Sequence, residues 1–225
     1  MPQLKLCIKL FKTLAKILLD LVFPPICVGC HIIGTRLCEK CYAGVEFLQL
    51  PIKIDPQLQY LDRILAAAHY GPPISSLIKA IKFQSAQEYC QVAALLIYIS
   101  ATIPRCDAIT AVPLHPQREQ ERGFNQAEEI AKHLSPKLKL PYLPLLIRTQ
   151  NTTPQSSVKD KSARLIRFKN AFEIHPKYVD RFTVPARCLL IDDVCTTGAT
   201  LNACAKILKQ AGCKKVIALT LAHGS

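Results

Sequence analysis

Two adjacent carboxylates, Asp192 and Asp193, and the loop 196–200 that follows them are the residues of this chain best suited to chemistry. The loop consists of Thr196, Thr197, Gly198, Ala199 and Thr200. Such a loop at the start of a helix binds phosphate, because free backbone N–H groups and the helix dipole attract the anion and hydroxyls add donors. Carboxylates beside a phosphate repel it unless they bind another group, such as sugar hydroxyls or a metal-bridged ligand. The combination predicts a site for a ribose 5-phosphate; the alternative is an ordinary strand, loop and helix with an exposed pair of acids.

The elements that must position these residues form an alternating pattern of strands and helices. The apolar run 188–191 predicts a buried parallel strand that ends at the acidic pair, and the apolar spacing after the loop predicts a helix that stops at Gly212. Earlier in the chain we expect strands over 63–70 and 108–114, helices over 74–82, 86–100 and 126–134, and a last strand over 214–221. Ser135-Pro136 is expected to end the helix over 126–134. Lys79 and Lys82 are expected to lie on the polar side of the helix over 74–82. A phosphate loop at the C-terminal end of a strand in such a pattern predicts a doubly wound, mainly parallel α/β fold.

Two arginines, Arg118 and Arg122, lie in the segment 115–125 that follows the strand 108–114. That segment is expected to leave the sheet at the same edge as the acidic pair, so both arginines can face the same pocket. Arginine beside a phosphate site favours bidentate binding of a diphosphate. The alternative is two surface arginines paired with Glu119 and Glu121.

Four cysteines are arranged as two Cys-x-x-Cys pairs, Cys27 with Cys30 and Cys38 with Cys41. Two such pairs close together supply four thiolates for a tetrahedral zinc ion, and four thiolates leave no open position for catalysis. The surrounding segment, 23–50, has few apolar residues, whereas structural zinc contributes about 10–16 kcal/mol in small modules. We therefore expect a zinc-binding lobe that the metal holds together; the alternative is free or disulfide-paired cysteines.

A basic stretch spans residues 148–169, where six cations face one acid, Asp160. The cations are Arg148, Lys159, Lys161, Arg164, Arg167 and Lys169. The segment 150–157 has no apolar periodicity and predicts a mobile loop, which could close over a diphosphate or follow a nucleic-acid backbone. Arg148, Arg164, Arg167 and Lys169 are the predicted nucleic-acid contacts. The alternative is a solvated basic hairpin.

Composition sets the class of protein. The chain has 225 residues, of which 50% are hydrophobic and 20% charged, which is typical of a globular protein with one domain and an appendage. Its net charge of +13 favours a polyanionic partner, nucleic acid above all. The odd number of cysteines, 11 in all and mostly within hydrophobic elements, indicates a reducing cytosol and not a disulfide scaffold.

The N-terminal segment, 1–22, carries lysines at helical spacing and predicts an amphipathic helix. Four lysines within the apolar span argue against a transmembrane helix, and no cleavage site for a signal peptide follows. The helix is expected to pack on the domain behind it, with peripheral contact to an anionic membrane as the alternative. Residues 23–50 then form the zinc lobe and 51–225 the main domain, with a linker over 50–56.

The stretch 188–200 resembles the phosphoribosyl pyrophosphate (PRPP) signature of the type I phosphoribosyltransferases, in which four apolar residues and two acids precede a Thr-Thr-Gly-x-Thr loop. The resemblance implies that Asp192 and Asp193 bind the ribose 2′- and 3′-hydroxyls, with Mg²⁺, while residues 196–200 surround the 5′-phosphate. In the 6-oxopurine branch of these enzymes an Asp stands before Thr-Gly and approaches the base. Here that residue is Thr196, and no segment with base-stacking aromatics is evident, although Phe124 could contribute.

The whole order of motifs is similar to that of the ComF family. The motifs are the four-Cys lobe, Val112-Pro-Leu-His-Pro116, Arg122-Gly-Phe-Asn-Gln126, Thr153-Pro-Gln155 with Asn170-Ala-Phe172, and the PRPP signature. The similarity extends from about Phe23 to His223. It implies a bacterial cytosolic protein linked to natural transformation, with single-stranded DNA and DNA-uptake or recombination proteins as partners.

Two functions of different classes follow from these observations. The favoured hypothesis is a ComF-like, DNA-handling protein that binds PRPP or a phosphoribosyl group with Mg²⁺. The alternative is a Mg²⁺-dependent transferase that moves ribose 5-phosphate from PRPP to a nucleobase. A third hypothesis, a PRPP-responsive regulator, would need a helix-turn-helix, and none is evident. The sequence assigns no catalytic base.

Overall fold

The computed structural model describes residues 21–48, 51–83, 87–150, 171–178 and 184–224. Residues 1–20 of the predicted N-terminal helix, residues 151–157 of the predicted loop 150–157, and Lys159, Lys161, Arg164, Arg167 and Lys169 lie outside the described residues.

A four-stranded parallel sheet carries the predicted site. Its strands are β1 (Arg63–His69), β2 (Ala108–Ala111), β5 (Arg187–Cys195) and β6 (Lys215–His223). They lie in the order β1-β6-β5-β2, and every neighbouring pair is parallel. The strand with the acidic pair therefore lies beside β2, which precedes Arg118 and Arg122. This arrangement confirms the doubly wound α/β prediction.

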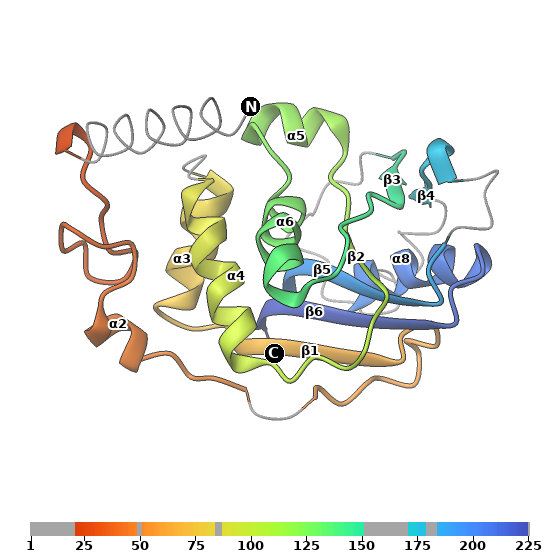
Figure 1. Cartoon of the computed structure of the whole chain (residues 1–225). Helices are drawn as coiled ribbons and strands as arrows, with labels where there is room; N and C mark the ends of the chain where they lie inside the picture. The colour runs from red at the N-terminus through yellow and green to blue at the C-terminus, as the bar shows by residue number, and fades with distance from the viewer. Residues whose placement is uncertain (1–20, 49–50, 84–86, 151–170, 179–183, 225) are drawn as a thin grey trace, which may run out of the picture.

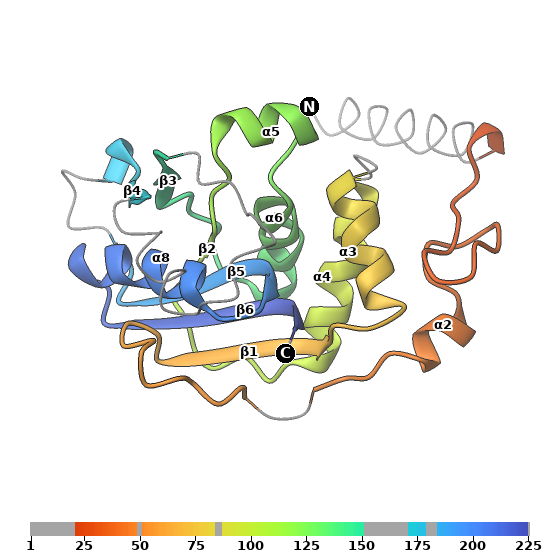
Figure 2. The same ribbon diagram turned by 180° about the vertical axis from the view of Figure 1, so that it is seen from behind.

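Helices cover both faces of this sheet (Figures 1 and 2). On one face lie α3 (Ile74–Phe83), α4 (Glu88–Ser100) and α6 (Gln126–Leu138), and on the other lies α8 (Ala199–Gln210). Alternate residues of β5 point to the two cores: Leu189 and Ile191 pack against α3, α4 and α6, whereas Cys188 and Leu190 pack against α8. A short hairpin of β3 (Leu146–Arg148) and β4 (Phe172–Ile174) joins the α8 side.

Four boundaries differ from the sequence prediction. The strand β5 does not end before the acidic pair but continues to Cys195, because its ladder with β6 continues through Asp192 and Val194 and backbone pairing does not depend on side-chain charge. The strand β2 is shorter than predicted and ends at Ala111. The helix α6 does not stop at Pro136 but runs to Leu138. Proline removes one backbone donor, yet its fixed φ is helical, and the final turn places Leu138 against the core.

The fourth difference concerns the segment predicted as a linker. Residues around Phe47 and Ile52 form antiparallel bridges with Ala68 and Ile64 of β1, and the N–H of Ile52 donates to the carbonyl of Ile64 at 2.9 Å. The described part of this segment therefore lies along the edge of the sheet. Unpaired backbone groups on the edge strand β1 explain why the chain follows it.

The segment between β2 and α6, predicted as a loop, contains the short helix α5 (Pro116–Arg122). It ends at Gly123, whose φ of 81° is readily adopted only by glycine. Asn125 then caps α6: its side chain accepts from the N–H of Ala127 at 3.1 Å and donates to the carbonyl of Val112 at 3.1 Å. The buried Asn125 thus fixes the start of α6 to the end of β2.

Candidate functional site

The loop 196–198 joins the end of β5 to the N-terminus of α8, so free N–H groups of the first helical turn lie beside it. Gly198 caps α8 with φ 73°, and a Cβ at this position would lie 2.7 Å from Cδ1 of Leu58. Glycine is therefore required both by the backbone conformation and by the approach of Leu58. The Thr197 hydroxyl accepts from the N–H of Ala199 at 3.4 Å, whereas the side chain of Thr196 is exposed. Residues 196–200 thus join the end of a strand to the N-terminus of a helix, which is the arrangement that the predicted phosphate-binding loop requires.

The two acids of β5 face different parts of the molecule. Asp192 lies on the α8 side, where its charge interacts with Arg148 and with the thiol of Cys204. Burial, and next the charge of Asp193, raise the pKa of Asp192 well above its usual range. The N–H of Asp193 donates to Oδ1 of Asp192 at 2.9 Å and partly opposes that shift.

Asp193 lies on the α3 side, where the ammonium nitrogen of Lys82 is 2.5 Å from its Oδ2 atom. The buried Oδ2 atom of Asp193 has no hydrogen-bond partner among the described residues, so the charge of Lys82 is what balances it. Lys82, expected on the polar side of α3, is mostly buried in this ion pair, whereas Lys79 is exposed. Lys82 follows Ile81 at the boundary of the apolar face of α3, and its long side chain reaches the end of β5.

Arg148 interacts with Asp192, Arg118 interacts with Arg148, and Arg122 is bonded to the start of α6. Arg148 is half-buried, with its guanidinium carbon 5.4 Å from the centre of the Phe172 ring, and its Nε donates to the carbonyl of Gln150 at 3.2 Å. Burial, and next the positive charge of Arg118, lower the pKa of Arg148. Arg148 thus interacts with both Arg118 and Asp192, which brings a residue predicted to contact nucleic acid toward the predicted phosphate site. Arg122 donates to the side chain of Gln126 at 3.0 Å, which holds it at the start of α6.

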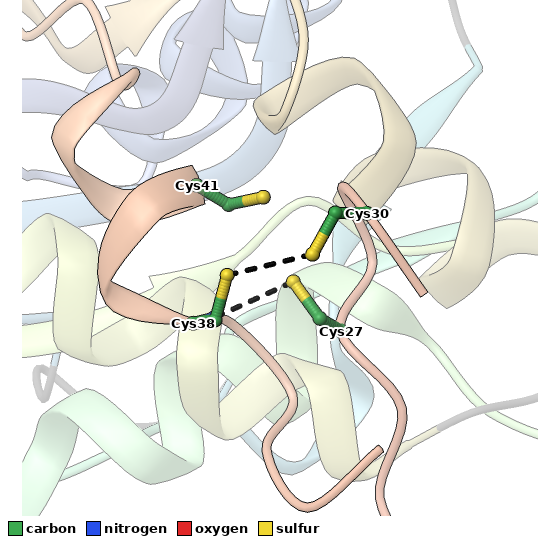
Figure 3. A group of neighbouring side chains, drawn as sticks. All are labelled: Cys27, Cys30, Cys38 and Cys41. Carbon is green, nitrogen blue, oxygen red and sulfur yellow. Dashed lines mark hydrogen bonds between the residues drawn. The ribbon is translucent and has the colours of Figure 1, made fainter. Parts of the chain in front are cut away.

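The four cysteines of the N-terminal lobe come together (Figure 3). The sulfur atoms of Cys27, Cys30, Cys38 and Cys41 all lie within 4.8 Å of one another. Although burial opposes ionisation, hydrogen bonds from the backbone of Cys30, Cys38 and Gly29 lower the pKa of the Cys27 thiol to about 6, whereas burial and the neighbouring thiols raise the pKa of Cys41 to about 12. Cys27 therefore ionises first within the cluster. A Cβ on Gly29 would lie 2.6 Å from the Cys41 sulfur, so this glycine leaves room for the thiol. The donor set and its spacing fit a four-thiolate metal site such as zinc.

This lobe is attached to the main domain by specific contacts. The Tyr89 hydroxyl donates to the carbonyl of Ile26 at 2.7 Å, and Arg36 forms an ion pair with Glu88, both at the N-terminal end of α4. Val28 and Val45 pack into the core formed with α3 and α4. The order of the four-Cys segment is thus coupled to the helices that carry Lys82.

Comparison with known proteins agrees with the geometry. Residues 121–225, which include the acidic pair and its loop, match the phosphoribosyl transferase domain family. The chain is 30% identical over 217 residues to competence protein F of Haemophilus influenzae, with 84% of this chain and 93% of that protein aligned. The chain belongs to the ComF family.

Two further relatives extend this ComF assignment. The chain is 30% identical over 194 residues to the DNA utilization protein YhgH of Escherichia coli K12, covering 80% of this chain and 81% of that protein. It is 37% identical over 110 residues to the competence protein ComFC of Streptococcus pneumoniae, covering 49% of this chain and 45% of that protein. Within the part of this ComF protein that the structure describes, no helix has both the length and the hydropathy to cross a membrane.

Sequence reasoning missed two contributors to the site of this ComF protein. Lys82 gave one signal, its position at the edge of an apolar helical face, but its partner is distant in the sequence. The segment 52–58 gave another, the alternation of Ile52 and Ile54, which is typical of a chain with one buried face. Lys82 lies next to Asp193, and the segment 52–58 lies next to the loop 196–198.

Proposed function

We propose that this ComF protein binds PRPP, or the phosphoribosyl group of another ligand, together with Mg²⁺, and acts in the handling of single-stranded DNA during DNA uptake. Loop residues 196–200 hold the 5′-phosphate, and Asp192 and Asp193 bind the ribose hydroxyls. Arg118, Arg122 and Arg148 bind the diphosphate, because guanidinium groups form paired hydrogen bonds with phosphate oxygens. Carboxylate oxygens are ligands that Mg²⁺ prefers, so the acidic pair also suits the ion that accompanies PRPP.

One observation carries this proposal: Asp192 interacts electrostatically with Arg148, which interacts with Arg118, at the strand end that leads into the loop 196–200. Carboxylates for a sugar, arginines for a diphosphate and a loop for a monophosphate thus occur together. A surface pair of acids would not need arginines from two other segments beside it.

The role in DNA handling is supported by the names of the relatives, which are competence and DNA utilization proteins. It is also supported by the net charge of +13. We propose that Arg164, Arg167 and Lys169, with Arg148, contact the phosphates of a strand that runs past the site. Competence and recombination proteins are the proposed partners.

We further propose that the four-Cys cluster binds structural zinc and that the protein is cytosolic. All ten cysteines that the structure describes are free, which is typical of a reducing compartment.

The second candidate function is transfer of ribose 5-phosphate from PRPP to a nucleobase. In that reaction a ring nitrogen bonds to the ribose C1′ carbon, the bond from C1′ to the diphosphate oxygen breaks, and the diphosphate leaves. The arginines would stabilise the departing negative charge. A cavity of about 620 Å³ beside the loop, lined by residues 52–58 with Thr196 and Thr197, is the observation that favours this candidate.

Calorimetric titration of the zinc-loaded protein tests the proposed function. PRPP should bind in the presence of Mg²⁺ and bind at least tenfold more weakly with EDTA, whereas ribose 5-phosphate and pyrophosphate should each bind more weakly than PRPP. Absence of PRPP binding at millimolar concentration would refute the proposal. Incubation with PRPP and free bases, followed by measurement of released pyrophosphate, separates a binding protein from an enzyme.

A further inference from the structure

Three buried thiols gather at the N-terminal ends of the strands, whereas the acidic pair lies toward the C-terminal end of β5. Cys188 is the second residue of β5, and Cys106 and Cys213 lie two residues before β2 and β6. Each of the three interacts electrostatically with the other two. Neither the proposed ligand site nor the four-Cys lobe uses these thiols.

Cys213 and Cys188 are hydrogen-bond partners. The Cys213 sulfur lies 3.5 Å from the carbonyl oxygen of Ala186, and the Cys188 sulfur lies 3.6 Å from that of Pro185. The N–H of Lys214 donates to the same carbonyl of Ala186 at 2.8 Å, which fixes the turn after α8 against the start of β5. The fold thus holds two thiols from separate segments together, and both are free.

Cys213 is the reactive member of this pair. Its hydrogen bond with Cys188 lowers the pKa of the Cys213 thiol to about 7; burial opposes this shift, and the charge of Lys209 adds to it. The same hydrogen bond, and next burial, raise the pKa of Cys188, so that thiol keeps its proton. A thiolate beside a protonated thiol suits an attacking and a resolving cysteine. Burial raises the pKa of the other described cysteines outside the four-Cys lobe, which are Cys90, Cys106, Cys195 and Cys204.

The position of Cys213 limits the size of its reaction partner. Only 3% of Cys213 is exposed, but its neighbours Gly212 and Lys214 are both exposed. The thiol therefore lies directly beneath the surface of the short connection between α8 and β6. Local opening of this connection admits a molecule as small as hydrogen peroxide and excludes a bulky disulfide such as oxidised glutathione.

We propose that Cys213 and Cys188 form a site of reversible oxidation by hydrogen peroxide, at which the two thiols become a disulfide. The Cys213 thiolate attacks one peroxide oxygen, the O–O bond breaks, and the departing hydroxide takes up a proton to give water. The Cys188 sulfur then attacks the sulfur of the resulting sulfenic acid, the S–O bond breaks, and the oxygen leaves as water with the Cys188 proton. Two thiols and one peroxide thus give one disulfide and two waters.

This disulfide closes the covalent loop 188–213, which contains the acidic pair, the loop 196–200 and α8. Closing a long loop restricts the unfolded chain and so stabilises the folded one. Oxidation therefore stabilises the unit that carries the proposed ligand site. The inference does not depend on PRPP binding, because the two thiols lie at the other end of β5.

Peptide mapping of the zinc-loaded protein after exposure to excess hydrogen peroxide tests this inference. Free thiols are blocked by alkylation as the protein is unfolded, and trypsin then releases Cys213 in the peptide 210–214 and Cys188 in the peptide 188–206. Mass spectrometry should find the two peptides linked through Cys188, and dithiothreitol should separate them. The melting temperature should rise by roughly 5–10 °C on oxidation and return after reduction.

Two single variants distinguish this pair from the third thiol. Cys188→Ala should abolish the link and leave Cys213 as a sulfenic acid that dimedone labels. Cys106→Ala, the matched control, should form the link at a rate within twofold of wild type. The wild-type mapping decides the question even where a variant fails to fold: absence of a link between Cys188 and Cys213 overturns the inference, and so does a link from Cys213 to Cys106.

Discussion

The ammonium nitrogen of Lys82, in the last turn of α3, lies 2.5 Å from Oδ2 of Asp193, near the end of β5. Both side chains are mostly buried, with 25% of Lys82 and 13% of Asp193 exposed, so solvent screens the pair only partly. The lysine offsets one of two adjacent negative charges and partly opposes the rise in the pKa of Asp192 that burial and Asp193 cause. In the absence of ligand, Lys82 therefore supplies positive charge where we propose that a metal-bound ligand binds.

Replacement of Lys82 by Met should destabilise the protein by about 1–3 kcal/mol, because it leaves the buried Oδ2 atom of Asp193 without its cation. Lys79→Met is the matched control: Lys79 is exposed on the same helix, and its loss should change stability by less than about 0.5 kcal/mol. Urea unfolding of both variants measures the difference. The double variant Lys82→Met/Asp193→Asn should recover most of the loss, and a failure to recover would show that the ion pair is not its cause.

The pH dependence of stability should carry the signature of Asp192. Since the folded-state pKa of Asp192 is raised, the folded protein binds a proton that the unfolded chain releases, and stability falls as pH rises through the window between the two pKa values. Asp192→Asn should remove this slope and raise the melting temperature near neutral pH, with about 2–4 °C for each kcal/mol regained. Thermal unfolding from pH 4 to pH 8 tests this. An unchanged slope in the variant would contradict the placement of Asp192 in a buried, acidic environment.

Ligand affinity should have the opposite pH dependence. A protonated Asp192 must lose its proton before it can bind Mg²⁺, so affinity for PRPP with Mg²⁺ should rise with pH through the same window. Calorimetry in two buffers of different ionisation enthalpy should detect the released proton. Binding without proton release below the raised pKa would indicate that Asp192 does not contact the metal-bound ligand.

Gly29→Ala should impair metal binding, because the added Cβ would lie 2.6 Å from the Cys41 sulfur. Gly44→Ala is the matched control in the same lobe, since its φ of −84° is ordinary and its Cβ would meet only a carbonyl oxygen at 3.5 Å. We expect one zinc per chain in wild type and Gly44→Ala by elemental analysis. Gly29→Ala and Cys38→Ser should lose zinc at lower chelator concentration and lose the order of the lobe. Equal zinc retention in all four proteins would argue against a four-thiolate site.

Affinity for single-stranded DNA should fall with salt. If about four to six phosphates are neutralised, log affinity against log salt has a slope of roughly −3 to −4. The triple variant Arg164→Ala/Arg167→Ala/Lys169→Ala should flatten that slope by about 2 and weaken all sequences alike, because phosphate contacts carry no base information. The control replaces three exposed cations by Ala. They lie at the N-terminal ends of β2 and β6 and are Arg105, Lys214 and Lys215. Filter binding that shows the same loss in both triple variants would assign the affinity to net charge rather than to a site.

The sequence predicted the parts of this site that lie within one stretch of chain. The apolar run, the acids and the small-residue loop 196–200 are contiguous, so strand, phosphate loop and helix N-terminus follow from local pattern alone. The partner of Asp193 could not be predicted, because Lys82 belongs to a helix that the fold brings to the end of β5. The segment 50–56 was predicted as a linker for a similar reason: Ile52 pairs with Ile64 only once the fold places β1 beside it.

The boundaries missed by the sequence prediction have tertiary causes. Asp192 and Asp193 are poor β formers, yet β5 passes through them because β6 continues to pair with it. Pro136 normally ends a helix, yet α6 continues for two residues because Leu138 gains core contacts. Tertiary packing exceeds local preference in both places.

The most direct test of the central claim is calorimetric titration of PRPP with Mg²⁺ into the wild-type protein, the double variant Asp192→Asn/Asp193→Asn and the control Asp62→Asn. Asp62 lies just before β1, at the N-terminal ends of the strands, whereas the acidic pair lies toward the C-terminal end of β5. Its side chain accepts from the N–H of Val216 at 2.8 Å. We predict saturable binding to the wild type and the control, and no detectable binding to the folded double variant. Wild-type affinity in the double variant would contradict the assignment of the acidic pair to the phosphoribosyl group.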